Sequence, residues 1–356
     1  MINPRLQRYV GRLTPEQDYL VREFVEYYED GGLRRRDLLE RVLHIAGSTA
    51  AAAGLLLALG VRPARADPLA APDAAPRAQL APRSPLSVPA SDPAVVGGDL
   101  AFPARDGVPL LGYVARPNAS GRFPAVLICQ ENQGLTEHFK DVARRFAKAG
   151  YVALALDILS RQGGTDAVPE NQRGAGLVGP GVADQQVRDY QDTMAYLRGQ
   201  PWVLGDRIGM IGYCLGGGVV FNVMAAEPTL RAAAPYYGLF TPATGEALRN
   251  TRAAALVVFG ANDNLTSNIP AIEAALQAAG VPHRINVYPD APHAFFNDTR
   301  PSLPNNGYVE SAALAAWDDT LAWFQTYLRA GLFPGTGDGS LATAPTGDGE
   351  GATEEE

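Results

Sequence analysis

Short apolar runs alternate with helix-like segments between residues 98 and 330. The runs are rich in Val, Ile, Leu and Ala, which is typical of buried strands. They predict strands over 110–116, 125–130, 152–157, 208–214, 232–237, 256–260 and 284–288. Apolar residues at helical spacing predict helices over 137–149, 183–198, 216–226, 269–279 and 309–328. This alternation favours an α/β fold with a mostly parallel sheet and helices on both faces, where ligands bind beyond the carboxyl ends of the strands.

The N-terminal region, residues 1–66, has a different pattern. Arg35-Arg36-Asp37-Leu38-Leu39 is followed by a weakly apolar stretch over 43–60 and then by Ala64-Arg65-Ala66. These are the three parts of an export signal, and the paired arginines resemble a twin-arginine signal. An amphipathic helix pair or an uncleaved membrane anchor remains an alternative. We therefore expect export to the periplasm, cell envelope or exterior, with a membrane contact only through an uncleaved signal.

Two low-complexity segments flank the central region. Residues 67–97 are rich in Ala and Pro, and residues 331–356 form an acidic Gly-rich tail. Such compositions bury too little apolar surface to offset the entropy of ordering. We expect a flexible linker and a disordered tail around one catalytic domain at 98–330. Removal of both flanking arms, residues 1–94 and 336–356, should then change stability little.

Charge and cysteine content exclude several classes of protein. The formal net charge is -8, much of it in the tail, and no basic-aromatic pattern predicts a nucleic-acid partner. Only Cys129 and Cys214 occur, and neither lies in a metal-binding spacing. We expect no metal or organic cofactor, although a disulfide between the two cysteines remains open.

A glycine-rich turn follows the predicted strand at 208–214. Its sequence Gly212-Tyr213-Cys214-Leu215-Gly216 matches the nucleophile elbow G-x-S-x-G, with Cys in place of Ser. Glycines let the strand and the next helix pass closely, and the dipole of that helix favours a thiolate. Cys214 is therefore the candidate nucleophile, against the alternative of a buried structural cysteine.

A nucleophile of this kind needs a base and a residue that orients the base. The chain has four histidines, and only His293 lies in a loop after a late strand. Asp263 follows the predicted strand at 256–260, so the order Cys, Asp, His is that of α/β-hydrolases. Asp290 and Asp298 are weaker candidates for the acid because they lie too close to His293 or after it.

The first core strand is followed by Glu131 and Asn132. The backbone amides of Asn132 and Leu215 could stabilise a tetrahedral oxyanion, while Glu131 would face the thiol. A helix-capping or solvated role for Glu131 remains an alternative.

Together these motifs resemble the dienelactone hydrolase family of α/β-hydrolases over residues 98–330. The resemblance implies a Cys-His-Asp triad of Cys214, His293 and Asp263, with Glu131 as the carboxylate that contacts the resting thiol and is displaced by substrate. Well-known members carry an Arg four residues after the His, where this chain has Asn297. Dienelactone itself is therefore in doubt. Candidate substrate-binding residues are Arg161, Arg173, Asn297, Tyr213 and Phe295, and Arg300 is a further replacement for the missing Arg.

The function that follows is hydrolysis of a small ester or lactone through an acyl-thioester intermediate. Two alternatives share the fold. An exported binding protein would use the pocket without turnover, and an acyltransferase would pass the acyl group to an acceptor other than water.

Overall fold

One eight-stranded sheet forms the centre of the computed structural model, which describes residues 11–61, 81–300, 302–303 and 305–329. The predicted cleavage site after Ala66 and the predicted tail lie outside these residues. The strands are β1 Val95–Pro103, β2 Pro109–Pro117, β3 Phe123–Cys129, β4 Val152–Leu156, β5 Val203–Tyr213, β6 Ala232–Tyr236, β7 Ala254–Gly260 and β8 His283–Tyr288.

The strand order is β1-β2-β4-β3-β5-β6-β7-β8. Strands β4, β3, β5, β6, β7 and β8 are parallel, whereas β2 is antiparallel to both β1 and β4. The predicted α/β-hydrolase fold class is confirmed, and seven strands lie where the sequence predicts them. The sequence did not reveal β1, because Val95–Pro103 is largely exposed and contains Gly97 and Gly98.

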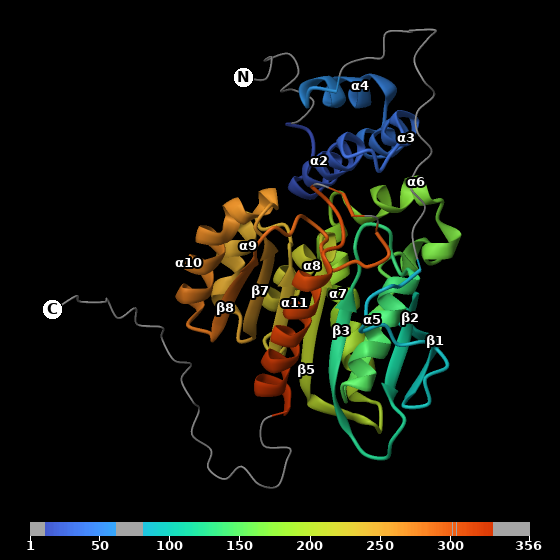
Figure 1. Ribbon diagram of the computed structural model, residues 1–356, viewed down its shortest axis with the longest axis vertical. Coiled ribbons are helices and arrows are strands. Elements are labelled where there is room, and N and C mark those ends of the chain that lie inside the picture. Colours follow the sequence, from blue (N-terminus) through green and yellow to red (C-terminus); the bar gives the residue numbers. More distant parts are fainter. Residues whose placement is uncertain (1–10, 62–80, 301, 304, 330–356) are drawn as a thin grey trace, which may run out of the picture.

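Helices cover both faces of the sheet (Figure 1). On one face, Phe146 of α5 contacts Trp317 and Phe324 of α11. Helices α7 and α8 pack together on the other. The described α-helices are α2 Pro15–Glu29, α3 Arg35–Ala46, α4 Thr49–Ala58, α5 Glu137–Lys148, α6 Glu170–Arg173, α7 Val182–Arg198, α8 Leu215–Ala226, α9 Pro242–Ala247, α10 Ile269–Ala279 and α11 Glu310–Phe324. The last helix continues in π-helical form over Gln325–Arg329, and 3-10 turns lie at Ser160–Gln162, Thr165–Ala167, Ala175–Leu177, Leu248–Asn250 and Asn264–Asn268.

The N-terminal helices α2, α3 and α4 pack over one end of the sheet, with α2 nearest to it (Figure 1). Leu20 and Phe24 of α2, Leu38 and Val42 of α3 and Leu55 of α4 are buried and join the core. The expectation that this arm docks little apolar surface is therefore wrong, and burial of these side chains should stabilise the fold.

Within the described residues, no single helix has the length and apolar composition needed to cross a bilayer. Helices α3 and α4 meet that requirement only as a pair, and the pair is bent by 113°.

The second half of the predicted linker is also packed. The backbone amides of Arg83 and Ser84 donate to Asp298, at 2.9 and 2.8 Å, and that of Val88 donates to Asp141 at 2.7 Å. Ser84 and Val88 are buried. The predicted flexible linker is thus wrong for this part, where buried carboxylates hold the backbone.

Candidate active site

Cys214 lies at a strained turn between β5 and α8. Its backbone has φ 56° and ψ -121°, a conformation that non-glycine residues rarely adopt. A Cβ on Gly212 would come within 2.3 Å of the Gly216 carbonyl oxygen, and one on Gly216 within 2.5 Å of that of Gln130. Both glycines are therefore required for the turn, as the sequence indicated. The thiol follows the carboxyl end of β5 at the N-terminus of α8.

His293 and Asp263 follow the ends of the neighbouring strands β8 and β7. The His293 Nδ1 atom and the Asp263 Oδ2 atom are 2.7 Å apart, and both side chains are buried. The ring of Tyr237 lies edge-on to the imidazole, with 4.9 Å between ring centroids. Because Asp263 binds Nδ1, the opposite nitrogen, Nε2, is the one available to a reacting group. The structure thus brings the three sequence-predicted residues Cys214, His293 and Asp263 into one site.

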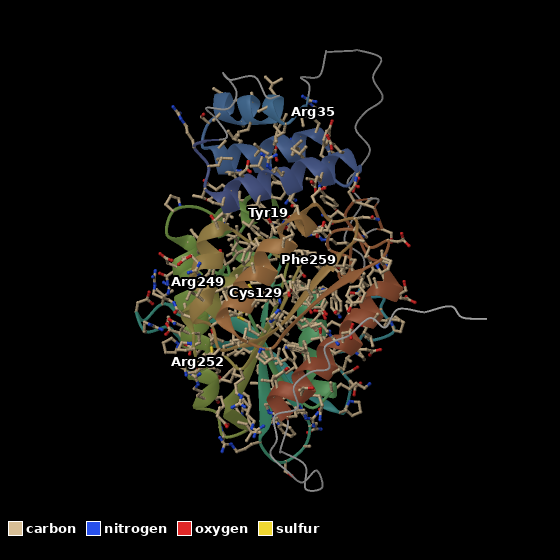
Figure 2. The ribbon with its side chains drawn as sticks, turned by 90° about the vertical axis from the view of Figure 1, so that its left-hand side faces the viewer. Tyr19, Arg35, Cys129, Arg249, Arg252 and Phe259 are labelled. Carbon is tan, nitrogen blue, oxygen red and sulfur yellow. The ribbon has the colours of Figure 1, made fainter. Side chains whose placement is uncertain are left out.

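Two side chains from helix α2 enter the same site. The Tyr19 hydroxyl lies 3.2 Å from Cys214 Sγ and 3.3 Å from His293 Nε2. The Cys214 thiol donates to Glu23 Oε2 at 3.2 Å. Figure 2 shows Tyr19 at the junction between the N-terminal helices and the rest of the chain. A segment distant in sequence therefore supplies the nearest polar neighbours of the thiol.

Burial and charge determine the protonation of these groups. Burial, followed by the charge of Glu23, raises the pKa of the Cys214 thiol to about 11. Burial alone would lower the pKa of His293, but the charge and hydrogen bond of Asp263 outweigh it and raise that pKa well above its usual value. Burial also raises the pKa of Tyr19 well above the ordinary range. With α2 in place, the thiol is therefore protonated at neutral pH.

Glu131 binds a partner other than the thiol. Its Oε2 atom accepts from Asn297 Nδ2 at 2.9 Å and from Arg300 Nε at 3.0 Å. Arg300 also lies 3.8 Å from Glu23. The carboxylate that accepts from the thiol is Glu23, so the expected contact of Glu131 with the resting thiol is not found. Asn297 holds Glu131 together with Arg300.

The other sequence-predicted residues are divided between the site and its surroundings. Leu215 begins α8, where helix amides have no partner within the helix. Asn132 Nδ2 donates to Glu23 Oε1 at 2.9 Å. Phe295 packs against Tyr237, which flanks His293.

Three predicted substrate-binding residues are engaged elsewhere. The Tyr213 ring stacks on Phe296 in the core. Arg161 forms ion pairs with Asp106 and Asp189, at 2.8 and 2.7 Å. Arg173 donates to the Val168 carbonyl at 3.1 Å. These contacts are with other residues of the protein, and a substrate-binding role for the three residues stays a prediction.

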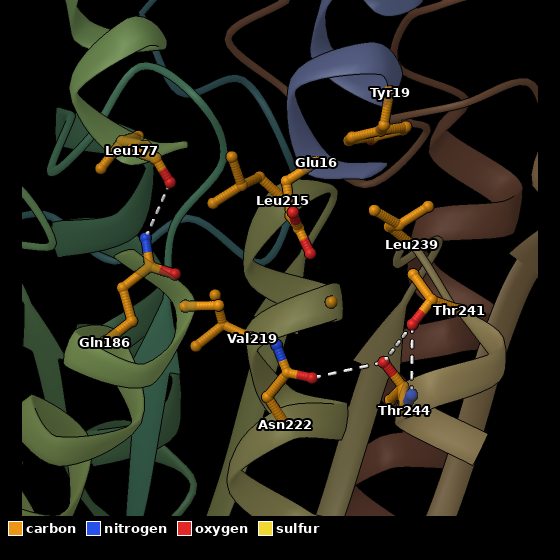
Figure 3. Close-up of a pocket in the computed structure, with 12 residues that line it drawn as sticks. Glu16, Tyr19, Leu177, Gln186, Leu215, Val219, Asn222, Leu239, Thr241 and Thr244 are labelled. Carbon is orange, nitrogen blue, oxygen red and sulfur yellow. Dashed lines mark hydrogen bonds between the residues drawn. The ribbon is translucent and has the colours of Figure 1, made fainter. Parts of the chain in front are cut away.

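A small pocket is lined in part by Leu215, the residue after Cys214, and by Tyr19 (Figure 3). Its empty space, including the open solvent at its mouth, is about 400 Å³, and apolar side chains such as Leu215, Val219 and Leu239 form much of its wall. At one end Thr244 donates to Asn222 at 3.4 Å and contacts Thr241 at 2.9 Å. The lining residues are Glu16, Tyr19, Leu177, Ala183, Gln186, Leu215, Gly218, Val219, Asn222, Leu239, Thr241 and Thr244. The pocket is therefore mostly apolar, with several neutral polar groups and the carboxylate of Glu16.

Glu23, Cys214 and His293 offer donor atoms within 4.8 Å of one another, a set that zinc accepts. Hydrogen bonds among these groups and Tyr19 account for their proximity.

Sequence reasoning missed Tyr19 and Glu23 because residues 1–66 were assigned to an export signal. One local signal was available. Thr14 and Gln17 form a reciprocal capping box around Pro15, which marks the start of a stable helix.

Comparison with known proteins identifies the family. A candidate nucleophile at a strand-helix elbow, with an Asp and a His after later strands of a mostly parallel sheet, is the arrangement of α/β-hydrolases. The model of the dienelactone hydrolase family matches residues 110–328, and the chain belongs to that family. It is accordingly a hydrolase.

Curated relatives and a solved structure are also similar to this chain. Proteins provisionally named carboxymethylenebutenolidase from Methylorubrum extorquens and Synechocystis are 32% and 35% identical, over 65% and 62% of this chain and 82% and 93% of theirs. A crystal structure of a provisionally named dienelactone hydrolase from Klebsiella pneumoniae is 30% identical. The superposed region covers 66% of this chain and 100% of the Klebsiella chain, with a TM-score of 0.60.

Proposed function

We propose that this hydrolase cleaves an ester or lactone through Cys214, with His293 as its base and Asp263 as the residue that orients the base. The observation that supports this most is the position of His293. Its Nδ1 lies 2.7 Å from Asp263 Oδ2. Its Nε2 and the Cys214 Sγ atom both lie within hydrogen-bond distance of the same Tyr19 hydroxyl. One small oxygen thus fits between nucleophile and base, as a leaving oxygen or an attacking water would.

The reaction divides into two steps. Cys214 transfers its proton to His293 Nε2, and the thiolate attacks the acyl carbon to form a carbon–sulfur bond. The oxyanion is stabilised by the Leu215 amide at the start of α8, together with the Asn132 amide. Collapse breaks the carbon–oxygen bond, and His293 protonates the leaving oxygen.

Deacylation reverses these roles. His293 removes a proton from water, the hydroxide attacks the thioester, and the Cys214 thiolate leaves as the acid product forms. Asp263 stabilises the imidazolium that forms in each step and maintains its orientation. We assign Glu131 to holding Arg300 beside the site.

The pocket next to Leu215 indicates the kind of acyl or alcohol group that fits. Leu177, Val219 and Leu239 offer an apolar wall, and Asn222 and Thr244 offer neutral hydrogen-bonding groups. We therefore propose small esters or lactones with a compact, largely apolar substituent. The relatives named carboxymethylenebutenolidase support a lactone among the substrates.

The test is a panel of aryl esters, lactones and thioesters, assayed with the purified full chain and with a Phe24→Ala variant, in which helix α2 is less firmly packed. Mass spectrometry of a quenched reaction should place the trapped acyl group on the peptide containing Cys214 and leave Cys129 free. Release of free acid, rather than transfer to an added alcohol, identifies hydrolysis. An acyl group on any other residue would contradict the mechanism.

We also propose that residues 1–66 direct export. The paired arginines Arg35 and Arg36 begin α3, and Arg36 is exposed where a transport receptor could reach it. Changing both to Lys should leave the protein in the cytoplasm, and cell fractionation checks this. Equal export of the variant and the parent would refute the proposal.

A further inference from the structure

Helix α2 presents one polar stripe to the active site. Tyr19, Glu23, Glu26 and Asp30 follow the i, i+4, i+7, i+11 spacing of a single helix face. Tyr19 and Glu23 contact the reacting groups, as described above. Glu26 accepts from Asn264 Nδ2 at 2.7 Å, next to Asp263 in sequence. The stripe is therefore complementary to the active-site loops along most of the helix.

The far end of the stripe contacts the loop that follows His293. Asp30 accepts from the backbone amide of Asn305 at 2.9 Å and from its side chain at 2.8 Å. The ring of Tyr27 lies 5.7 Å from the guanidinium of Arg300. The helix is thus held by the loops that carry both Asp263 and His293.

The apolar side of α2 also packs against the rest of the protein. Leu20 and Phe24 pack so closely on Gly174 that a Cβ there would lie 3.0 and 2.9 Å from them. The guanidinium of Arg41 lies 5.3 Å from the Phe24 ring and forms an ion pair with Glu170 at 2.8 Å. Contacts on two sides therefore keep α2 in this position.

The docked helix occupies the space that the reaction needs. The Tyr19 hydroxyl lies between Cys214 Sγ and His293 Nε2, where a leaving oxygen or a water must lie. The thiol donates its hydrogen bond to Glu23. Cys214 has 0% of its surface exposed, so an acyl carbon has no access to the sulfur.

We propose that α2 is an intramolecular inhibitor, in which Tyr19 and Glu23 occupy the reaction position and turnover requires the helix to leave. This inference concerns regulation of the site and rests on the proposed function for its link to ester turnover. The chain's own helix acts as a competitor of the substrate. Its withdrawal opens Cys214 and removes the negative charge of Glu23 from the thiol.

A catalytic role for the same residues makes the opposite prediction. If Tyr19 or Glu23 moved protons during turnover, loosening the helix would slow the reaction. If they block the site, loosening the helix speeds both turnover and chemical modification of the thiol. The sign of the effect therefore separates the two roles.

The first experiment loosens α2 without changing any group at the reacting atoms. In the full-length Phe24→Ala variant, the lost packing on Gly174 and Arg41 shifts α2 toward release. We expect alkylation of Cys214 by iodoacetamide, followed by peptide mapping, to become roughly tenfold faster or more, because a released helix exposes the thiol. Aryl-ester turnover should rise with it.

Phe102→Ala is the matched control. Phe102 is equally buried but stacks on Tyr196 in another part of the molecule. Its change should leave alkylation of Cys214 at the parental rate. Parental or slower alkylation in Phe24→Ala would overturn the proposal. Faster alkylation without ester turnover would keep α2 as a blocking helix and refute the proposed function instead.

The second experiment holds α2 in place. Asp30→Cys with Asn305→Cys puts two thiols where the side chains now bond. The oxidised full chain, with this cross-link verified by peptide mapping, should lose at least about tenfold of its ester turnover and regain it in dithiothreitol. Asp30→Cys alone should respond to neither treatment. Undiminished turnover in the cross-linked protein would overturn the proposal.

Discussion

Two regions of the chain build one site in different ways. The catalytic domain places Cys214, Asp263 and His293 just after strands whose parallel arrangement brings their ends together. The N-terminal helices place Tyr19 and Glu23 on those same residues only by tertiary docking. The first region carries its chemistry in local motifs. In the second region, Tyr19 and Glu23 reach the site only because helix α2 docks on it.

The largest expected effect is in the catalytic domain. Cys214→Ala or His293→Ala in the Phe24→Ala background should lower ester turnover by roughly 10³-fold or more, because nucleophile and base act as a unit. Steady-state kinetics with an aryl ester measures this. Cys214→Ser should also lose most activity, since a hydroxyl ionises far less readily than a thiol. Near-full turnover in Cys214→Ala would place the chemistry elsewhere.

A smaller loss is expected for the residue that orients the base. Asp263→Asn keeps the shape of the side chain but removes the charge beside His293 Nδ1, so it favours the wrong tautomer. Turnover should fall less than in His293→Ala. The pKa of His293 should also fall, because Asp263 is what holds it high. NMR titration of the imidazole checks this, and an unchanged pKa would contradict it.

The N-terminal region should act on the thiol in the opposite direction. Glu23→Gln removes a negative charge that raises the thiol pKa, so that pKa should fall from about 11 and more thiolate should exist at pH 8. Titration of the Cys214 thiolate by its ultraviolet absorbance, with a Cys214→Ala protein as the blank, should show the shift in the closed form, because alkylation would report the release of α2 instead. Glu26→Gln is the control, because Glu26 binds Asn264. An unshifted profile would show that Glu23 does not influence the thiol.

The smallest effect on turnover is expected for Arg161, which does not take part in the contact between the N-terminal helices and the catalytic domain. Arg161→Ala breaks ion pairs with Asp106 and Asp189 that are partly exposed to solvent. Aryl-ester turnover should stay within about twofold of the parent, since these ion pairs join Arg161 to carboxylates away from Cys214 and His293. A marked rise in KM without loss of stability would restore Arg161 as a substrate-binding residue.

The accuracy of prediction from sequence follows the same division. Seven strands and the residues after them were predictable because apolar runs and the Gly212-x-Cys214-x-Gly216 turn are local signals. The partner of Glu131 was not, since Arg300 reaches it across 169 residues of sequence. The docking of α2 was equally hidden. Its polar stripe is visible in the sequence, but the face that it covers depends on the finished fold.

Under the proposed inhibition by α2, a side chain added at Gly174 would raise the resting activity of this protein. The Gly174 backbone is helical, with φ -58° and ψ -42°, so a larger residue fits the local conformation. The added side chain would press on Phe24 and Leu20 and touch no reacting group. It would raise the energy of the closed form alone, and every 1.4 kcal/mol or so multiplies the open fraction tenfold while that fraction is small. Replacing Gly174 by Ala, Val and Leu in turn should therefore increase the fraction of open, active molecules step by step. The chemistry of each active molecule should stay unchanged.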